Sequence, residues 1–217
     1  MRLNLRAPNQ GESSQTGYLN EHGNAHWLLP ADDSVDLAVL PWLPSMDRYD
    51  FLVLPASLFA TKDVIDKEKI TEGDRVLFTG LFYRLPRDHK MKPIIREGTL
   101  AMLPDEKIKT TRGKLGTIYL ADVHAIKGSS GSPVMVNLGG VRQGSIMGDR
   151  ELLLGIVSGY FVEDENLNLE VTTTIHGSGQ ANSGISIIVP ADELKKLLEQ
   201  PEVQQLRDAE VKAKTGK

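Results

Sequence analysis

The sequence contains no cysteine in 217 residues. This absence excludes a disulfide scaffold, a thiolate metal site and a cysteine nucleophile. The sequence also lacks any apolar run near the roughly 20 residues that a membrane-spanning helix needs, and residues 1–11 lack the apolar core of a signal peptide. We therefore expect no membrane partner. If Met1 is the true start of the protein, we expect it to be cytoplasmic.

Neither sign of charge dominates the chain. Its 25 basic and 29 acidic side chains give a net charge of −4 at pH 7, so no strong field favours nucleic acid or an anionic surface. The composition, 40% hydrophobic and 25% charged, is typical of a folded globular protein. The length suits one large domain or two smaller ones that share a face.

Short apolar runs separated by turn residues fill most of the chain, which has 20 glycines and 11 prolines. Residues 2–6 alternate polar and apolar side chains, a pattern typical of a half-buried strand. Further short runs, most of them bounded by Gly, Pro, Asp or Asn, occupy residues 37–40, 51–54, 76–78, 118–121, 134–136, 152–157 and 185–189. Many short strands with few helices favour a sandwich or a barrel.

One helix signal follows Pro190. Asp192 suits the positive end of a helix, and three leucines (Leu194, Leu197 and Leu198) fall on one face. Pro201 interrupts this pattern, and residues 201–217 are strongly polar. We expect a frayed helix there that passes into a disordered tail.

The segment Gly-Ser-Ser-Gly-Ser-Pro at residues 128–133, followed by an apolar run, carries the clearest chemical signal. A serine hydroxyl is a poor nucleophile unless a base removes its proton and hydrogen-bond donors await the oxyanion. Neighbouring glycines let the backbone turn so that N–H groups and the serine Oγ face one point. The alternative interpretation is that this segment is a surface turn of small residues with no chemical role.

This segment resembles the nucleophile loop of trypsin-like (chymotrypsin-fold) serine peptidases. Asp36, at the mouth of an apolar run, resembles the family's segment that delivers the triad aspartate. Residues 73–80 resemble the last strand of the first barrel, and residues 96–100 the opening strand of the second. Residues 155–159 are similar to the strand that lines the specificity pocket, and residues 183–190 to the closing strand.

The resemblance implies an all-β fold of two packed antiparallel β-barrels of chymotrypsin type, the first incomplete, with a C-terminal helix. Residues 1–88 would form the partial N-terminal barrel and residues 89–200 the C-terminal barrel with its helix. Residues 201–217 would be the polar tail. The implied activity is that of a trypsin-like serine endopeptidase, which hydrolyses peptide bonds through an acyl-enzyme.

Site residues carry over from the family one by one. Ser130 would be the nucleophile, and the N–H groups of Gly128 and Ser130 would form the oxyanion hole. Asp36 would orient the histidine, although Asp32 and Asp33 lie alongside as alternatives. The resemblance implies a peptide or protein substrate as the partner, and we expect no cofactor, no metal and no nucleic acid.

Substrate contacts follow from the same resemblance. Ser158, Gly159 and Tyr160 would pair with the substrate backbone as an added strand. His124, six positions before Ser130, would lie at the floor of the specificity pocket or be a structural histidine. Tyr160 would narrow that pocket and favour small aliphatic side chains.

The sequence departs from the family's pattern at the catalytic histidine. In this family it precedes the aspartate, and only His22 and His26 precede Asp36, neither in the apolar-Ala-x-His context. Residues 2–6 resemble the strand that follows the catalytic histidine, which would then lie upstream of Met1. Without a base we expect this chain to be inactive.

A shortened chain, a degenerate protein and a base from another chain all fit that departure. The alternative function is a pseudoprotease that retains the cleft as a peptide-binding or scaffolding module. A β-barrel interaction domain, in which residues 128–133 are only a turn, also remains open.

Overall fold

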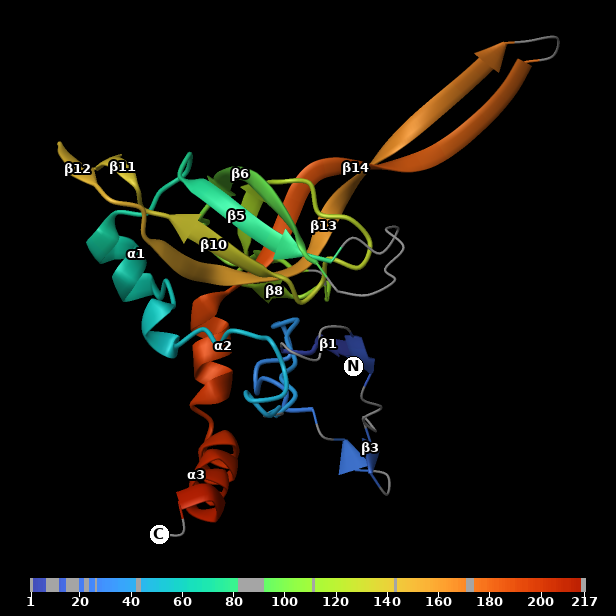
Figure 1. The fold of residues 1–217 in the computed structure, drawn as a ribbon. Coiled ribbons are helices and arrows are strands. Elements are labelled where there is room, and N and C mark those ends of the chain that lie inside the picture. Colours follow the sequence, from blue (N-terminus) through green and yellow to red (C-terminus); the bar gives the residue numbers. More distant parts are fainter. Residues whose placement is uncertain are drawn as a thin grey trace.

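The computed structural model describes residues 2–6, 12–14, 20–21, 24–25, 27–41, 44–81, 92–110, 112–142, 144–170 and 174–215. The protein is mostly β, with a closed antiparallel barrel at its centre and two helices at its C-terminal end (Figure 1). The barrel strands are β5 (Arg75–Gly80), β6 (Ile94–Met102), β9 (Tyr119–Asp122), β10 (Pro133–Asn137), β13 (Glu151–Glu170) and β14 (Thr174–Pro190). The expectation of an all-β barrel protein that ends in a helix is thus confirmed.

The barrel consists of two antiparallel meanders. One meander is β5-β6-β9 and the other is β10-β13-β14. They join along two ladders, β10 with β5 and β14 with β9, which close the sheet on itself. Closure removes the exposed edges that an open sheet would present. The chain passes from the first meander to the second only once, between β9 and β10.

The core fills the barrel from alternate positions of its strands. Val76 and Phe78 of β5 are buried, and the residues between and beside them are not. Val134 and Val136 of β10 are fully buried opposite them, in register with β5. Each such side chain contributes about 1.5–3 kcal/mol through removal from water. This interior fixes the strands that carry the candidate site.

The strand at residues 73–80 belongs to a different barrel from the one expected. Its residues pair with β6 from Arg75↔Thr99 to Gly80↔Ile94, and with β10 from Val76↔Val136 to Val134↔Phe78. The strand is where the sequence predicted it, but it is part of the closed barrel and does not end an earlier one. The expected boundary after residue 88 lies outside the described residues and stays a prediction.

Two small hairpins and one long one extend from the barrel. β7 (Ile108–Lys109) pairs with β8 (Leu115–Gly116) between β6 and β9, and β11 (Gly140–Arg142) pairs with β12 (Ser145–Met147) between β10 and β13. β13 and β14 continue their pairing past the barrel as far as Glu170↔Thr174. This long hairpin projects well away from the rest of the molecule (Figure 1).

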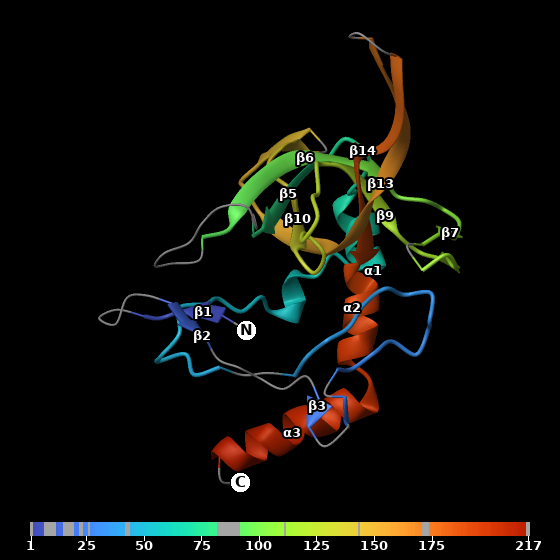
Figure 2. The same ribbon diagram turned by 90° about the vertical axis from the view of Figure 1, so that its right-hand side faces the viewer.

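The N-terminal segment lies beneath the barrel, beside the C-terminal helices, in both ribbon views (Figures 1 and 2). Its described residues form short pairs: β1 (Arg2–Asn4) with β2 (Glu12–Ser14), and β3 (Asn20–Glu21) with β4 (Asn24–Ala25). The isolated bridges Leu5↔Tyr49 and Leu28↔Val39 add further contacts. No second closed barrel occurs among the described residues. The short 3₁₀ helix η1 (Ala56–Leu58) and α1 (Lys62–Glu68) then lead to β5.

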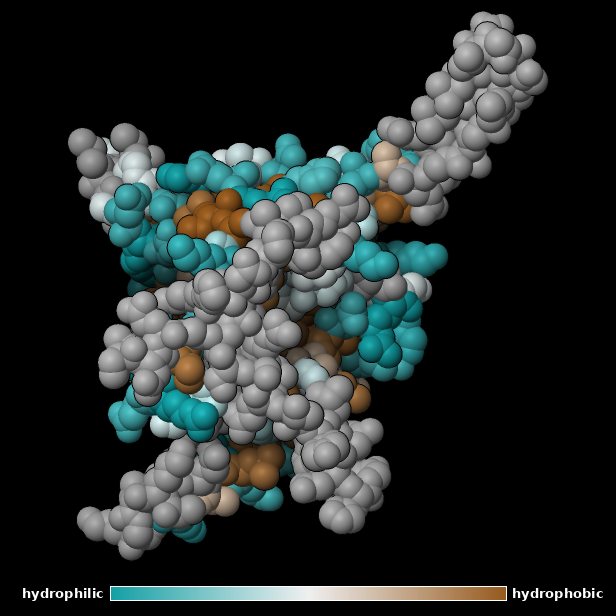
Figure 3. Space-filling model, turned by 45° about the vertical axis from the view of Figure 1, so that its right-hand side comes forward, coloured by the Kyte–Doolittle hydropathy of each residue, from teal (hydrophilic) through white to brown (hydrophobic). Residues whose placement is uncertain are grey.

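The apolar runs at residues 37–40 and 51–54 are not strands, and the first forms only the isolated bridge of Val39 to Leu28. Leu52 is 98% exposed and Val53 is 64% exposed. Exposed apolar surface occurs in separate patches among hydrophilic residues on the face drawn in Figure 3. The prediction of a strand here is wrong because an apolar run reports the composition of a segment but not whether a partner strand lies beside it.

The C-terminal helices are α2 (Ala191–Leu198) and α3 (Pro201–Thr215). The helix predicted after Pro190 is confirmed, with Ala191 and Leu197 buried against the body of the protein. The structure has α3 in place of the tail expected from residue 201. Pro201 begins this helix, where its missing N–H costs nothing, and Val203 is buried. None of the helices in the described part of the chain is long and apolar enough to cross a membrane.

Candidate active site

The single crossing between the two meanders, residues 123–132, contains the Gly-Ser segment. Strand β14 anchors the start of this loop through Ser186, whose hydroxyl accepts the Ala125 N–H at 3.2 Å and donates to the Val123 carbonyl. The side-chain amide of Asn182, also on β14, donates to the Ala125 carbonyl. The loop therefore starts from a fixed point on the barrel.

The turn itself is held by Ser129. Its N–H donates to the Ile126 carbonyl at 2.9 Å, and its hydroxyl accepts the Ile126 N–H at 3.1 Å. Gly128 and Gly131 have φ angles of 92° and 85°, which side-chain-bearing residues rarely adopt. Ser129 is only 3% exposed, whereas Ser130 is exposed to solvent. The two adjacent serines thus differ: Ser129 is structural, and Ser130 presents its hydroxyl.

The far end of the loop is joined to β13. The Gly131 N–H donates to the Val157 carbonyl at 2.9 Å, and the Val157 N–H donates to the Ser132 carbonyl at 2.9 Å. This pairing brings Ser130 next to the following residue of β13. The Ser130 hydroxyl donates to the Ser158 carbonyl at 3.1 Å.

A β-bulge at Ser158 connects this serine to Asp36. Val157 pairs with Ile188 and Gly159 with Ile187, which leaves Ser158 as the extra residue on β13. A bulge redirects a side chain out of the regular alternation of its strand. The Ser158 hydroxyl donates to Asp36 Oδ2 at 3.0 Å. Ser130 and Asp36, 94 positions apart in the chain, thus hydrogen-bond to the carbonyl and the hydroxyl of one residue.

The three neighbouring aspartates bind different partners. Asp32 accepts the Ser34 N–H at 2.9 Å, and the Ser34 hydroxyl and N–H together lower the pKa of Asp32. Asp33 pairs with Lys114 on the surface. Asp36 is half-buried and is the one of the three that hydrogen-bonds to Ser158. Asp32 and Asp33 are therefore occupied elsewhere.

Two amides next to the Ser130 hydroxyl are available as donors. Among the described residues, the N–H groups of Gly128 and Ser130 donate no hydrogen bond. They belong to the same tight turn as the Ser130 Oγ, in which Gly128 and Gly131 take left-handed φ angles. Unpaired N–H groups beside an exposed serine are the donors that an oxyanion requires.

The other predicted site residues surround this arrangement. His124 lies in the same loop with an exposed side chain, between the buried Val123 and Ala125. Gly159 is half-buried, and Tyr160 is half-buried against the barrel core. His22 and His26 lie outside the described residues. No three metal-ligating side chains of the described part lie close enough together to hold a metal ion.

Sequence reasoning assigned Ser158 to substrate pairing and missed its hydrogen bond to Asp36. A polar residue followed by glycine at the end of the apolar run 152–157 is a signal for a bulge, and Ser158-Gly159 has this pattern. That signal could have located the distortion but not its partner. Comparison with known proteins adds no assignment, because no family model, curated protein or solved structure matches the chain.

Proposed function

We propose that this chain carries the serine site of a trypsin-like endopeptidase, with Ser130 as the nucleophile. The observation that supports it best is the convergence of Ser130 and Asp36 on Ser158, through hydrogen bonds of 3.1 and 3.0 Å. In the family a serine and an aspartate are two members of the catalytic triad, and here Ser130 and Asp36 are both held next to Ser158. The serine lies in a tight turn flanked by two glycines with left-handed φ angles, a conformation that suits a nucleophile loop.

The fold supports the same proposal. Under this proposal, the closed barrel is the second of the two barrels of chymotrypsin type. The N-terminal segment that carries Asp36 then belongs to the incomplete first barrel. A cleft between the two layers would then contain Ser130 from one side and Asp36 from the other. Residues from separate layers commonly form such sites, because loops on rigid strands position the reacting groups.

The described residues hold Ser130 but do not activate it. Its hydroxyl donates to the Ser158 carbonyl, and an amide carbonyl is far too weak a base to remove a proton at neutral pH. Activation needs an imidazole between Ser130 and Asp36, and in the family's order that histidine precedes Asp36. We therefore expect the described groups alone to give no hydrolysis.

With an imidazole supplied, the chemistry follows from the groups present. The base takes the proton of the Ser130 hydroxyl as Oγ attacks the peptide carbonyl carbon. The carbonyl oxygen of the peptide becomes an oxyanion, which the Gly128 and Ser130 N–H groups stabilise. The imidazolium, oriented by Asp36, then gives its proton to the leaving amine, and an acyl-enzyme remains on Ser130. Water attacks the ester in the same way, releasing the acid and restoring the hydroxyl.

Substrate would bind along β13 beyond the end of its pairing with β10. On the side of the serine loop, the pairing of β13 with β10 ends at Ile156↔Pro133, followed only by the two bonds of Val157. Beyond that point Gly159 and Tyr160 of β13 pair with Ile187 and Ser186 of β14. An extended peptide could add to this edge by backbone hydrogen bonds.

The alternative function is a peptide-binding module that keeps this edge without catalysis. The hydrogen bond from the Ser130 hydroxyl to a carbonyl favours it, because the serine rests in an unactivated state. Both functions use the same edge and differ only in whether Ser130 reacts.

A fluorophosphonate probe, which modifies only activated serines, tests whether a base reaches Ser130 in this chain. We expect no labelling of the 217-residue chain above the level of Ser130→Ala. Robust labelling that Ser130→Ala abolishes and Ser57→Ala retains would instead show that His22 or His26 serves as the base, and His22→Ala and His26→Ala would identify which.

Binding of a fluorescent peptide pool tests the edge itself. Peptide binding that survives Ser130→Ala but is lost in Gly159→Pro, with the melting temperature of each variant as the folding control, supports the proposed edge. Binding that Gly159→Pro leaves unchanged in a folded protein would contradict it. Because both functions use this edge, absence of peptide binding by the folded chain would leave neither function standing.

A further inference from the structure

An open cavity of about 790 Å³ lies at the base of α2, away from the serine loop. It is lined by α1, by the first turns of α2, and by the connection between β6 and β7. Ser130, Asp36 and Ser158 are not among its lining residues. Its walls include the apolar side chains of Ile65, Ile70 and Leu103. These could pack against the hydrocarbon part of a ligand.

Tyr119 is one of the residues that line this cavity and carries a phenolic hydroxyl. It pairs with Ile188 on β14, two residues before Pro190 and the start of α2. The residue is only 7% exposed. Its hydroxyl forms no hydrogen bond with a described residue and is not among the fully buried polar atoms, so it is open to the cavity that Tyr119 lines. Buried tyrosines usually have a hydrogen-bond partner. An unpartnered hydroxyl on a residue that lines a cavity indicates a ligand group that would complete it.

The charge around that hydroxyl is negative. The cavity lining has three lysines, Lys62, Lys107 and Lys196, against six carboxylates: Asp66, Glu72, Asp105, Glu106, Asp192 and Glu193. Burial first, and then the charges of Asp192, Glu193 and Asp66, raise the pKa of Tyr119 to about 12. The hydroxyl therefore stays neutral and can accept a hydrogen bond from a cation.

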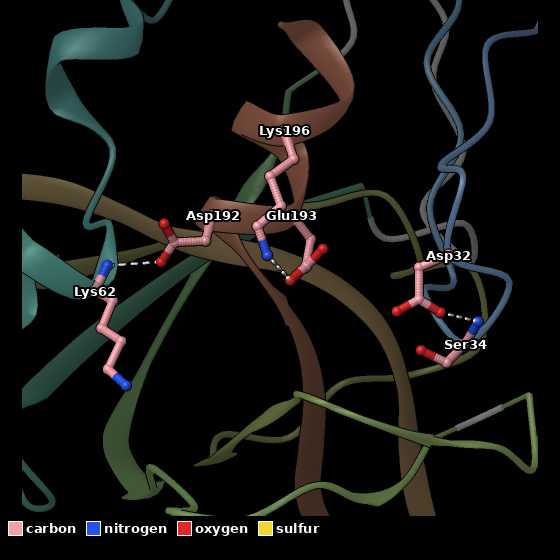
Figure 4. Close-up of polar contacts among 6 residues, drawn as sticks. All are labelled: Asp32, Ser34, Lys62, Asp192, Glu193 and Lys196. Carbon is pink, nitrogen blue, oxygen red and sulfur yellow. Dashed lines mark hydrogen bonds and ion pairs between the residues drawn. The ribbon is translucent and has the colours of Figure 1, made fainter. Parts of the chain in front are cut away.

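The charges of Lys196 and Lys195 lower the pKa of Asp192, but neither lysine forms an ion pair with it. Lys196 is engaged with Glu193 at 2.7 Å. Asp192 accepts the backbone N–H of Lys62 at 2.6 Å, while the Lys62 ammonium extends away from that carboxylate (Figure 4). Burial raises the pKa of Asp192 by more than the Lys62 N–H and the two lysine charges lower it, so a further cation would stabilise its ionised form. Among the described residues, neither Asp66 nor Asp192 forms an ion pair with a side chain.

From these observations we propose that the cavity at the base of α2 binds an alkylammonium group, through the Tyr119 hydroxyl and the carboxylates of Asp66 and Asp192. A metal ion does not suit the site, because no three ligating side chains in the described part lie close enough to hold one. An ammonium on a hydrocarbon stem matches both the negative charge and the apolar wall. The stem belongs to a free amine or to a lysine side chain of a polypeptide. The site does not depend on the function proposed for Ser130.

Titration of the ¹⁵N-labelled full chain with n-butylammonium at pH 7 and low salt tests the site. We expect saturable shifts of the Lys62 and Tyr119 amides, with n-butanol as the matched neutral probe giving none. Tyr119→Phe and Asp66→Asn should each weaken binding about threefold to tenfold. Glu163→Gln, an exposed charge on β13, should leave the affinity unchanged. Asp66 is exposed on α1, so its variant keeps the test valid if Tyr119→Phe does not fold.

Either of two results would overturn the proposal. One is the same shifts with butanol, and the other is unchanged affinity in both Tyr119→Phe and Asp66→Asn. A lysine blocked at both ends distinguishes the sources of the ammonium. Tighter binding than that of butylammonium assigns the site to a polypeptide, and equal binding assigns it to a free amine. Both outcomes support the site.

Discussion

The hydrogen bond from Ser158 to Asp36 should have a measurable effect on stability. Ser158→Ala removes the hydroxyl donor, 3.0 Å from Asp36 Oδ2, and leaves the backbone carbonyl that accepts from Ser130. A hydrogen bond to a charged group contributes about 1.5–3 kcal/mol net. Both residues are half-buried and have a further interaction each. We therefore expect a loss near the lower end, about 1–1.5 kcal/mol.

Urea denaturation measures this loss. The midpoint should fall with the m-value unchanged, since the compactness of neither state changes. For a chain of this size, thermal melting should drop by about 2–4 °C per kcal/mol. Ser57→Ala is the matched control, because Ser57 is exposed on η1. That variant should stay within about 0.5 kcal/mol of the unmodified chain.

A double-mutant cycle decides whether the two groups interact. Asp36→Ala and Ser158→Ala should each destabilise the protein, and the double variant should lose less than their sum by about 1 kcal/mol. Additivity within about 0.3 kcal/mol would refute the reasoning. It would mean that Ser158 does not connect Ser130 with Asp36, and the main support for the peptidase site would fall with it.

Three further predictions concern the turn, the helices and acid stability. Gly131→Ala should cost about 1–2 kcal/mol in urea denaturation because its φ is 85° in open space, whereas Gly148→Ala, also in open space but without a left-handed φ, should cost far less; equal losses would contradict the conformational explanation. Asp192→Ala removes the acceptor for the Lys62 N–H at the start of α1 and should lower stability by about 1 kcal/mol. Asp192→Asn keeps an acceptor and removes a charge that burial disfavours, so its stability at pH 7 should be no lower than that of the unmodified chain; a larger loss for Asn than for Ala would exclude this role. The N–H of Leu103, the N–H of Glu72 itself and the Thr71 hydroxyl lower the pKa of Glu72 from 4.5, so its stabilising effect is complete above that pH and is lost as the pH falls through the lowered value. Melting temperatures of Glu72→Gln should therefore decline less steeply below pH 4.5, and parallel curves for the two proteins would count against it.

The positions of strands were more predictable than their partners. The runs at residues 76–78, 134–136, 152–157 and 185–189 became parts of β5, β10, β13 and β14, because each is apolar and bounded by turn residues. Which barrel residues 73–80 would join was not predictable. The ladders of a sheet pair residues that are far apart in sequence, such as Val76 and Val136. The local composition of a strand does not indicate which strand it pairs with.

Two local sequence patterns were each compatible with two different structures. The apolar run at 51–54 reads as a strand, yet Leu52 is 98% exposed, because strand propensity needs a neighbouring surface to take effect. Pro201 reads as the end of a helix, although proline suits the first position of the next one equally well. In both places tertiary contacts decided between the two readings.

Two residues of the candidate site, Ser130 and Asp36, were predictable from the sequence, but their connection through Ser158 was not. Ser130 and Asp36 were found because a Gly-Ser turn and an aspartate before an apolar run are local signals. Their connection through Ser158 depends on a register shift between β13 and β14. A one-residue shift reverses the side to which a side chain points. No local property of residue 158 determines that.

The single passage of the chain between the two meanders makes the barrel separable. Cutting the backbone between residues 127 and 128 would yield two fragments, one with β5, β6 and β9 and the other with β10, β13 and β14. Two antiparallel ladders would remain between them without any covalent link. Such halves, produced apart and mixed, could reassemble, and Ser130 would then lie at the end of a polypeptide that regains its shape only in the presence of its complement.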